Sequence, residues 1–575
     1  MLETRGNEFY LDDKPFRILS GSIHYFRVVP ELWEDRLLKL KECGFNTVET
    51  YLPWNVHEPK KGMFNFTGLA DVEAFVRLAE KLGLYVILRP SPYICAEWEF
   101  GGLPAWLLKD KNMRLRCSDP AYLKQVEEYF DVLLPKLAPL QRTQGGPVIA
   151  MQIENEYGAY GDDKSYLRAI KEMYEKHKLD VLLFTSDGPD MIEAGSLPDV
   201  LTTLNFGSRV DEAEEHLERL KPGSPKFCAE FWIGWFDSWG NPHHVRGEDD
   251  TGEIFGELLD KGWSVNFYMF HGGTNFGFMN GANHYETYDP TITSYDYDAL
   301  LTEDGERTAK FYEVQKILYA FQKLDVPAKQ ESKRVRTEEM TVKLTEKVSL
   351  FAALDTVATL TKAPAPLSFE ELDQNYGYVL YRTQISGSGE KIIDLTPVQD
   401  RALIYINGEF QTTYDLNEDK KERTFFFPDE VNTLELLVEN MGRVNYGKHL
   451  QDSKGLVKNL WINNRYHFDW EMYSVAFEDV SMTLPEAGES RYPFLLKGEV
   501  TISEPQDKFV SLTGFTKGNV WINGFHLGRY WNIGPQQTLY LPAPLLKKGE
   551  NAVLVLELEH TNTTNIQLLN KAVLG

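Results

Sequence analysis

Short apolar runs alternate with amphipathic stretches through residues 1–325. The amphipathic stretches have helical periodicity and are commonly followed by glycine, which predicts helices with ordinary C-terminal stops. The apolar runs predict eight strands, in the segments FRILSGSIHYF, NTVETYLPW, LYVILRPSPY, PVIAMQIENEY, VLLFTSDG, VLTTLNFG, KFCAEFWIGW and VNFYMFHGG. Eight strands alternating with helices favour an α/β TIM barrel over an open sheet. In that fold chemistry takes place at the carboxyl ends of the strands, so the ends of these segments are candidate site positions.

Beyond residue 325 the helical period fades and polar and apolar residues alternate, which is typical of short strands. A near-repeat occurs there: ALIYINGEF at 402–410 and NVWINGFHLGRYW at 519–531, each followed by a second apolar strand. The Asn-Gly pairs at 407–408 and 523–524 predict tight hairpin turns. We therefore expect two β-sandwich domains, the first at 326–480 with a bridging segment and the second at 481–575.

Composition narrows the class of protein. The chain has 575 residues and a formal net charge of -26, which argues against nucleic acids and anionic membranes as partners. The first residues, MLETRGNEFYLDD, contain neither a basic nor an apolar stretch, so no signal peptide is visible and we expect a cytoplasmic location, with a removed leader left open. Only four cysteines occur, without a CxxC pair, which favours reduced thiols over two disulfides.

Two glutamates close the fourth predicted strand, in the segment VIAMQIENEY. A period of two places Ile149, Met151 and Ile153 toward the outer helices, and Gln152, Glu154 and Glu156 toward the barrel interior. Glu154 would then lie one layer deeper and support its neighbours, while Glu156 would lie at the open rim. We therefore expect Glu156 to be the chemical residue of the two.

A second carboxylate at the rim is available at the end of the seventh predicted strand. Glu230 is the only acidic residue in the aromatic segment KFCAEFWIGW. Two carboxyl groups at the mouth of a barrel are the machinery of glycoside hydrolysis, in which one protonates the leaving oxygen and the other attacks the anomeric carbon. A lone glutamate is more often a salt-bridged structural residue, but two glutamates at the rims of strands four and seven, with aromatic residues beside both, favour catalysis.

Several long motifs resemble glycoside hydrolase family 35, the β-galactosidases. Along the chain they are YLPWNVHEP, RPSPYICAEWEFGGLPAWLL, GGPVIAMQIENEY, AEFWIGWFDSWG, YMFHGGTNFG and TSYDYDALLTEDG, and they occur in the same order as in that family. The resemblance implies a TIM barrel followed by β-sandwich domains of jelly-roll, galactose-binding-like type, a retaining mechanism, and neither metal nor cofactor. It also implies that Glu156 is the acid/base and Glu230 the nucleophile.

Further site residues follow from the same resemblance. Asn155 resembles the residue that binds the sugar 2-hydroxyl, Trp235 the platform under the galactose ring, and Tyr295 a tyrosine that keeps the nucleophile ionised. The remaining sugar contacts implied are Tyr51, Cys95, Ala96 and Glu97. Phe278 departs from the pattern, because animal lysosomal members carry a tyrosine there. As leaving-group contacts we expect Trp232, Trp239 and Tyr446, the last from a long polar loop at 439–455.

Three other residue sets are weaker candidates. His57 is better explained by a structural hydrogen bond, Cys95 by close packing, and the His243-His244 pair by a loop, since no further metal ligands accompany it. The β-domains either bind sugar or brace the barrel, and we favour bracing.

The sequence thus predicts a retaining exo-β-galactosidase that removes terminal non-reducing β-D-galactose, with a β-1,3 preference. Its partner is a small carbohydrate, and a homodimer is left open. The alternatives are an exo-β-glucosaminidase on the same scaffold and a non-catalytic galactose-binding protein.

Overall fold

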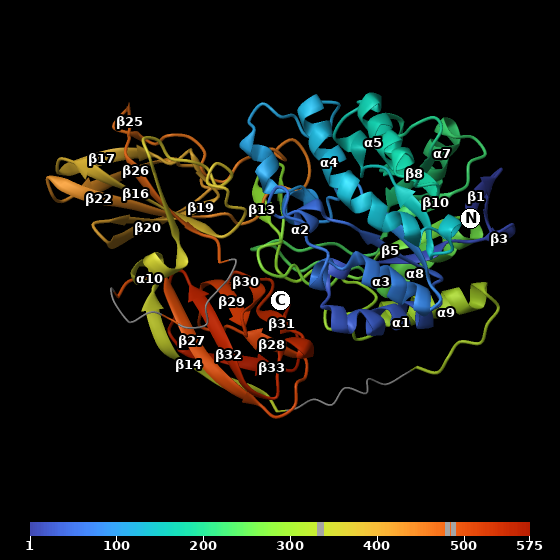
Figure 1. Ribbon diagram of the computed structural model, residues 1–575. Helices are drawn as coiled ribbons and strands as arrows, with labels where there is room; N and C mark the ends of the chain where they lie inside the picture. Colours follow the sequence, from blue (N-terminus) through green and yellow to red (C-terminus); the bar gives the residue numbers. More distant parts are fainter. Residues whose placement is uncertain (330–337, 478–483, 485–489) are drawn as a thin grey trace.

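The computed structural model describes residues 1–329, 338–477, 484 and 490–575. Its N-terminal half is a closed parallel barrel in the strand order β10-β11-β4-β5-β6-β7-β8-β9 (Figure 1). The barrel strands are β4 (Leu19–Ile23), β5 (Thr47–Tyr51), β6 (Tyr85–Arg89), β7 (Val148–Gln152), β8 (Leu182–Asp187), β9 (Leu201–Phe206), β10 (Phe227–Trp232) and β11 (Ser264–His271). The predicted TIM barrel followed by β-domains is therefore confirmed.

Helices surround the barrel and bury one face against it. The N-terminal turns of α3, α4 and α5 are each capped by an aspartate side chain that accepts backbone N–H groups, as helix starts require. The helices are α1 (Trp33–Cys43), α2 (Trp54–His57), α3 (Val72–Lys81), α4 (Pro120–Leu137), α5 (Lys164–Lys176), α6 (Ile192–Gly195), α7 (Val210–Leu220), α8 (Glu248–Asp260) and α9 (Ala309–Phe321).

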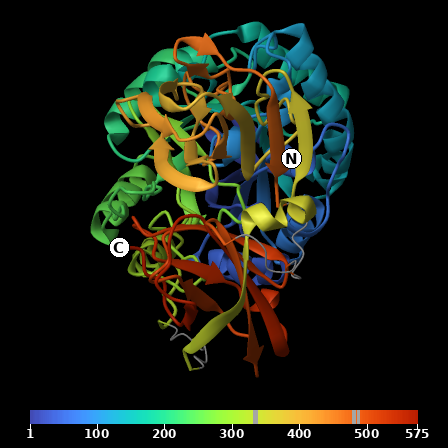
Figure 2. The ribbon, with the colours of Figure 1, turned by 90° about the vertical axis from the view of Figure 1, so that its left-hand side faces the viewer.

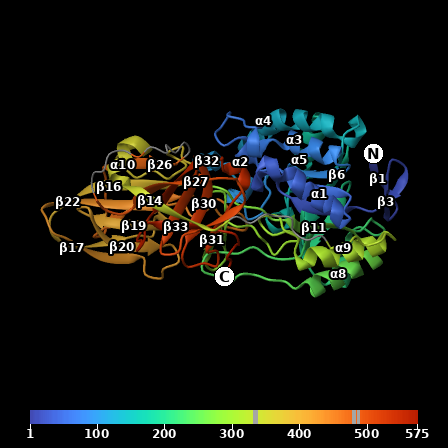
Figure 3. The same ribbon diagram turned by 90° about the horizontal axis from the view of Figure 1, so that it is seen from below.

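A small N-terminal sheet closes the floor of the barrel. Its strands β1 (Leu2–Arg5), β2 (Glu8–Leu11) and β3 (Lys14–Phe16) contribute apolar side chains to one cluster with barrel residues such as Ile87 and Phe184. The N-terminus lies on the side of the barrel that faces away from the β-domains (Figures 1 and 3). The site must therefore open at the opposite end, toward those domains.

The first β-domain packs a six-stranded sheet, in the order β15-β26-β16-β22-β19-β20, against a four-stranded sheet, β21-β17-β24-β25. The Asn407-Gly408 turn between β19 and β20 has φ values of 51° and 82°, which confirms the predicted tight turn. The strands are β15 (Thr359–Ala363), β16 (Tyr378–Ser386), β17 (Gly389–Asp394), β18 (Val398–Gln399), β19 (Arg401–Ile406), β20 (Glu409–Asp415), β21 (Glu422–Phe427), β22 (Val431–Glu439), β23 (Gly455–Leu456), β24 (Trp461–Ile462), β25 (Arg465–Tyr466) and β26 (Trp470–Val475).

The second β-domain contains the order β30-β29-β32-β27-β14-β33-β28-β31. Strand β14 (Met340–Ser349) falls within the predicted range of the first domain, but it pairs with β27 and β33 and so completes the second one. The helix α10 (Leu350–Val357) then leads into the first domain. The other strands are β27 (Phe494–Ile502), β28 (Lys508–Ser511), β29 (Lys517–Ile522), β30 (Phe525–Trp531), β31 (Thr538–Leu541), β32 (Gly549–Glu557) and β33 (Asn565–Leu569).

Both β-domains rest on the barrel and on each other (Figure 2). A shared apolar cluster joins them, with Leu380 and Leu437 from the first domain and Leu554 from the second. Against the barrel, Thr293 bonds with the backbone of Arg529. A hairpin of β12 (Ala282–His284) and β13 (Tyr288–Pro290) lies at the junction. In the described ranges no helix combines the length and apolarity needed to cross a bilayer, and all four cysteines are free thiols.

Candidate active site

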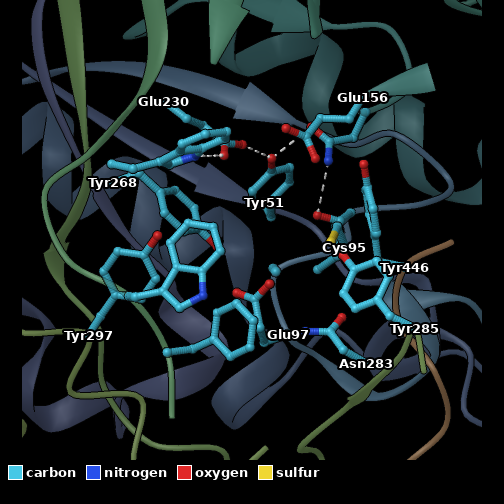
Figure 4. A pocket seen from close by; sticks show the side chains of 16 residues that line it. Tyr51, Cys95, Glu97, Glu156, Glu230, Tyr268, Asn283, Tyr285, Tyr297 and Tyr446 are labelled. Atoms are coloured by element: carbon cyan, nitrogen blue, oxygen red, sulfur yellow. Dashed lines mark hydrogen bonds between the residues drawn. The ribbon is translucent and has the colours of Figure 1, made fainter. Parts of the chain in front are cut away.

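A cavity of about 230 Å³ opens at the carboxyl ends of the barrel strands. Most of its wall comes from the barrel and its loops, and one residue comes from the first β-domain (Figure 4). The lining residues are Tyr51, Ile94, Cys95, Ala96, Glu97, Asn155, Glu156, Glu230, Trp232, Trp235, Phe236, Tyr268, Asn283, Tyr285, Tyr297 and Tyr446. The structure thus brings both candidate carboxylates and most of the predicted contact residues together.

Glu156 follows strand β7 and adopts a left-handed backbone conformation with φ of 45°. The side-chain amide of Asn205, at the end of β9, donates a hydrogen bond of 3.0 Å to Glu156 Oε1. Burial, together with the negative charge of Glu230, raises the pKa of Glu156 to about 8. Glu156 is therefore protonated at neutral pH and can donate a proton.

Glu230 lies on strand β10, and three donors converge on its carboxylate. Arg89 Nη1 lies 2.7 Å from Oε1, the Tyr51 hydroxyl donates to the same oxygen, and the Trp232 indole N–H donates to Oε2 at 3.1 Å. A guanidinium and two neutral donors stabilise a negative charge on this carboxylate. Figure 4 shows the Tyr51 ring between the two glutamates.

The environments of the two carboxyl groups therefore differ in the way that acid and nucleophile require. One carboxyl is held neutral by burial and by a like charge, and the other is surrounded by donors that favour the anion. Neither Arg89 nor Asn205 was singled out from the sequence. Both are polar residues at or next to the end of a predicted apolar strand, which is the signal that would have identified them.

The segment before Glu156 differs from the predicted regular strand. Strand β7 ends at Gln152, and the φ of Glu154 is 55°. Glu154 turns away from the cavity, where Arg116 donates to both of its oxygens at 2.9 Å and Tyr166 of helix α5 donates at 3.0 Å. The prediction that Glu154 points into the barrel beneath Glu156 is wrong, because the chain leaves the extended conformation.

Strand β7 also departs from a strict period of two at its start. The register between β6 and β7 shifts after Val148, so Ile149 joins the cluster at the barrel floor. Met151 and Ile153 pack in the main cluster with the outer helices, as predicted. The same-face assignment of Ile149 is therefore wrong, for the local reason that a bulge inserts one residue.

Asn155 lines the cavity, and its side-chain nitrogen donates a hydrogen bond of 3.4 Å to the Ile94 carbonyl. Its Oδ1 accepts hydrogen bonds from the Tyr51 hydroxyl at 2.8 Å, from Arg89 at 2.8 Å and from Gln152 at 3.1 Å. With the oxygen fully used, only the second N–H of the amide remains to bind a ligand hydroxyl. Arg116 fixes the backbone by donating to the Asn155 carbonyl at 2.7 Å.

The loop of Cys95, Ala96 and Glu97 lines the cavity with three consecutive left-handed residues, with φ of 56°, 56° and 48°. Such residues cost about 1–2 kcal/mol each, and the surrounding contacts hold them there. Arg27 donates a hydrogen bond to the Ala96 carbonyl. Burial raises the pKa of Glu97 to about 7, although the hydrogen bond from Tyr295 and the charge of Arg27 act in the opposite direction.

Tyr295 lies beside this loop rather than beside the nucleophile. Its hydroxyl donates to Glu97 Oε2 and lies 3.0 Å from the hydroxyl of Tyr268. The expected contact with Glu230 is made instead by Tyr51, Arg89 and Trp232. Tyr295 therefore orients Glu97, which is the carboxylate that faces the cavity on this side (Figure 4).

Aromatic side chains form the outer part of the cavity. Trp232 and Trp235 line it with ring centroids 5.8 Å apart, and Trp235 is 42% exposed. Tyr446 reaches the cavity from the loop of the first β-domain, as predicted. Trp239 does not line the cavity: it is buried against Trp531 of the second β-domain, with centroids 6.5 Å apart, because the chain has turned toward that domain.

The weaker candidates have structural partners. His57 Nε2 bonds the Tyr25 hydroxyl at 2.6 Å, and both His243 and His244 bond Asp237. Burial raises the pKa of the Cys95 thiol, which makes it a poor nucleophile. At the junction with the second β-domain, the guanidinium carbon of Arg529 lies 4.8 Å from the centroid of the Phe278 ring.

Two residue groups in the described ranges have metal-ligand spacing. They are His284, His449 and Asp452 beside the cavity wall, and Asp190, Glu212 and His216 near the start of α7. In the first group the two imidazoles stack at 22° with centroids 4.0 Å apart, so their nitrogen lone pairs do not converge on one point as a metal requires. The second group is formed largely by solvent-accessible side chains.

Known protein families match all three domains of the chain. Residues 8–321 match glycosyl hydrolases family 35, residues 366–476 match the first all-beta domain of beta-galactosidase, and residues 493–551 match its galactose-binding domain. The family match covers more than half of the chain, and the two further matches fall on the two β-domains.

Full-length relatives extend the similarity over nearly the whole chain. Human beta-galactosidase-1-like protein 2 is 42% identical over 97% of this chain and 89% of its own length. Human beta-galactosidase is 42% identical, with 96% and 86% covered, and beta-galactosidase of Xanthomonas manihotis is 40% identical, with 94% and 91% covered. The chain therefore belongs to family 35 of the glycosyl hydrolases, and its enzyme class is that of a retaining β-galactosidase.

Proposed function

We propose that this β-galactosidase acts from the non-reducing end and prefers β-1,3-linked galactose in an oligosaccharide or glycoconjugate. The observation that carries the hydrolytic chemistry is the pair of carboxyl groups in one cavity: the pKa of Glu156 is raised to about 8, and Glu230 pairs with Arg89 Nη1 at 2.7 Å. The modest size of the cavity, about 230 Å³, supports removal of a single terminal residue.

In the first step Glu230 attacks the anomeric carbon while Glu156 gives its proton to the leaving oxygen. In the second step Glu156, now ionised, takes a proton from water, and that water releases the sugar from Glu230. Asn155 binds the 2-hydroxyl through the amide N–H that does not donate to the Ile94 carbonyl. Glu97, with one oxygen held by Tyr295, accepts hydrogen bonds from other sugar hydroxyls.

A linkage preference would act at the aromatic wall, where the leaving sugar lies. Trp232, Trp235 and Tyr446 line the outer cavity and restrict how the leaving sugar can lie against them. Hydrolysis of galactosyl-β-1,3-, β-1,4- and β-1,6-linked disaccharides side by side tests this. The highest kcat/KM should belong to the β-1,3 substrate, and a higher value for either other linkage would refute the preference.

A panel of nitrophenyl glycosides tests the sugar itself. Release from the β-galactoside, and much slower release from the β-glucosaminide, is expected. The opposite order would favour an exo-β-glucosaminidase. Binding of galactose in calorimetry without any hydrolysis would favour a binding protein. Glu230→Gln should abolish turnover, whereas Glu156→Gln should retain activity on substrates with good leaving groups.

A further inference from the structure

A second cavity, of about 270 Å³, adjoins the catalytic one. It lies between the ends of strands β9 and β10 and the start of helix α7. Its lining residues are Pro189, Asp190, Asn205, Phe206, Gly207, Ser208, Arg209, Glu212, Ala213, Trp232, Gly234, Trp235 and Arg246. The β-galactosidase reaction as described above makes no use of this cavity.

The second cavity lies on the leaving-group side of the site. It shares Trp232 and Trp235 with the catalytic cavity, so the two indoles form the partition between them. It also shares a wall with the acid, because Asn205 lines it and donates to Glu156 Oε1. The proton of Glu156 goes to the leaving oxygen, so a chain that continues from that oxygen passes toward this side.

The wall of the second cavity is built rigidly. Arg246 Nη2 donates to the Gly207 carbonyl at 2.7 Å and Nη1 donates to the Trp232 carbonyl, which ties the end of β9 to the end of β10. A Cβ on Gly207 would lie 2.8 Å from the Trp232 carbonyl oxygen, so this close approach requires glycine. The cavity is thus a fixed feature of the barrel rim.

The lining has the chemistry of a neutral-sugar site. Trp235 offers a partly exposed indole for stacking on a sugar ring. Arg209 and Glu212, whose side chains pair at 3.1 Å, offer donors and acceptors for hydroxyl groups at the opposite wall. Asp190 and Arg246 complete a balance of two acidic and two basic side chains, which favours neither anionic nor cationic ligands.

We propose that this second cavity binds the second residue of the leaving group, a neutral sugar, so that the enzyme prefers substrates of three or more sugar units. The proposal rests on the proposed hydrolysis of β-galactosides. It assigns to the enzyme an extended oligosaccharide substrate rather than a disaccharide.

The test compares a disaccharide with a neutral trisaccharide that has the same terminal galactose and scissile linkage. We expect kcat/KM to be about fivefold or more higher for the trisaccharide, since binding to a remote residue of the leaving group lowers the transition-state barrier. Ser208→Trp should fill the cavity from its exposed side and remove this advantage. Arg209→Ala should reduce it without adding bulk.

Two controls separate this proposal from the proposed function. Hydrolysis of an aryl β-galactoside, which does not extend into the second cavity, should stay within about twofold of wild type in Ser208→Trp. Glu215→Trp, on the exposed side of the same helix and outside the cavity, should keep the trisaccharide advantage. If the wild type, Ser208→Trp and Glu215→Trp all fail to hydrolyse the aryl β-galactoside, the galactosidase proposal is refuted instead.

Three results would overturn the inference. They are equal kcat/KM for the disaccharide and trisaccharide in the wild type, an advantage that survives unchanged in Ser208→Trp, and a higher kcat/KM for a trisaccharide whose last residue is a uronic acid. The last result would show that the cavity selects an anion, against the balanced charge of its lining.

Discussion

Replacing Glu230 by glutamine should lower the pKa of Glu156. In the wild type that pKa is raised to about 8, first by burial and next by the charge of Glu230. The glutamine keeps the size of the side chain and removes only the negative charge. The protonated form of Glu156 then loses one of its two main sources of stabilisation relative to the ionised form.

The magnitude follows from Coulomb's law. Carboxyl groups of a retaining pair lie roughly 5 Å apart, and two unit charges at that distance repel by about 3 kcal/mol at an effective dielectric constant of about 20. That energy corresponds to a pKa difference of about 2. Arg89, which pairs with Glu230, partly offsets the charge, so we expect a fall of about 1 to 2 in the pKa of Glu156.

Infrared difference spectroscopy can follow the carboxylic acid band of Glu156 during a pH titration of the Glu230→Gln variant. Subtracting the Glu156→Gln/Glu230→Gln double variant identifies the band. Glu303→Gln is the matched control: it removes another buried carboxyl, hydrogen-bonded to Thr274 and Ser294, and should leave Glu156 unchanged. A pKa of Glu156 that stays near 8 or rises in Glu230→Gln would refute the electrostatic coupling.

Three further predictions follow from the same contacts. The kcat/KM of the wild type for a galactosyl disaccharide, whose sugar leaving group needs a proton, should fall as pH rises above about 8, because Glu156 then loses the proton that it donates; a decline that is complete below pH 6 would contradict this. Tyr51→Phe should lower kcat by about 10- to 100-fold, since it removes a hydrogen bond to the charged Glu230, and an unchanged kcat in a folded variant would argue against that role. Arg116→Met should lower the free energy of unfolding by about 3–5 kcal/mol in denaturant titration, because Glu154 is left buried without its cation; a loss below about 1 kcal/mol would contradict this.

The sequence was sufficient for the features that depend on local pattern and on strand ends. The alternation of apolar and amphipathic segments predicted the barrel, and the Asn-Gly turns predicted the hairpins of both β-domains. Glu156, Glu230 and Asn155 lie in one cavity because strand ends of a parallel barrel meet at one rim. For Glu156 and Glu230 the inference needs only the position of a polar residue at a strand end. Asn155 was implied by the resemblance to the family alone, since a strict period of two would turn it toward the helices.

Other features depend on partners that are distant in sequence, and local pattern does not contain them. Glu154 turns outward because Arg116, 38 residues before it, supplies a bidentate partner. Trp239 is buried because Trp531 of the second β-domain lies against it. Strand β14 belongs to the C-terminal sheet because its pairing partners follow more than 140 residues later, in β27 and β33. Pattern alone assigned β14 to its sequence neighbours.

The same long-range dependence makes the first β-domain part of the catalytic cavity. Arg443, in the loop that carries Tyr446, is fully buried between Glu99 of the barrel at 2.7 Å and Glu370 of its own domain at 2.6 Å. Nearby, the Tyr93 hydroxyl donates to the Asn445 carbonyl at 2.5 Å.

A buried carboxylate that loses its only strong cation is destabilising by several kcal/mol. The barrel without the β-domain would lose Arg443, which contacts Glu99 from the other domain. It would also lose Tyr446 from the cavity wall. The pairing across the junction thus couples the barrel rim to the placement of a leaving-group contact, so the first β-domain is part of the catalytic unit.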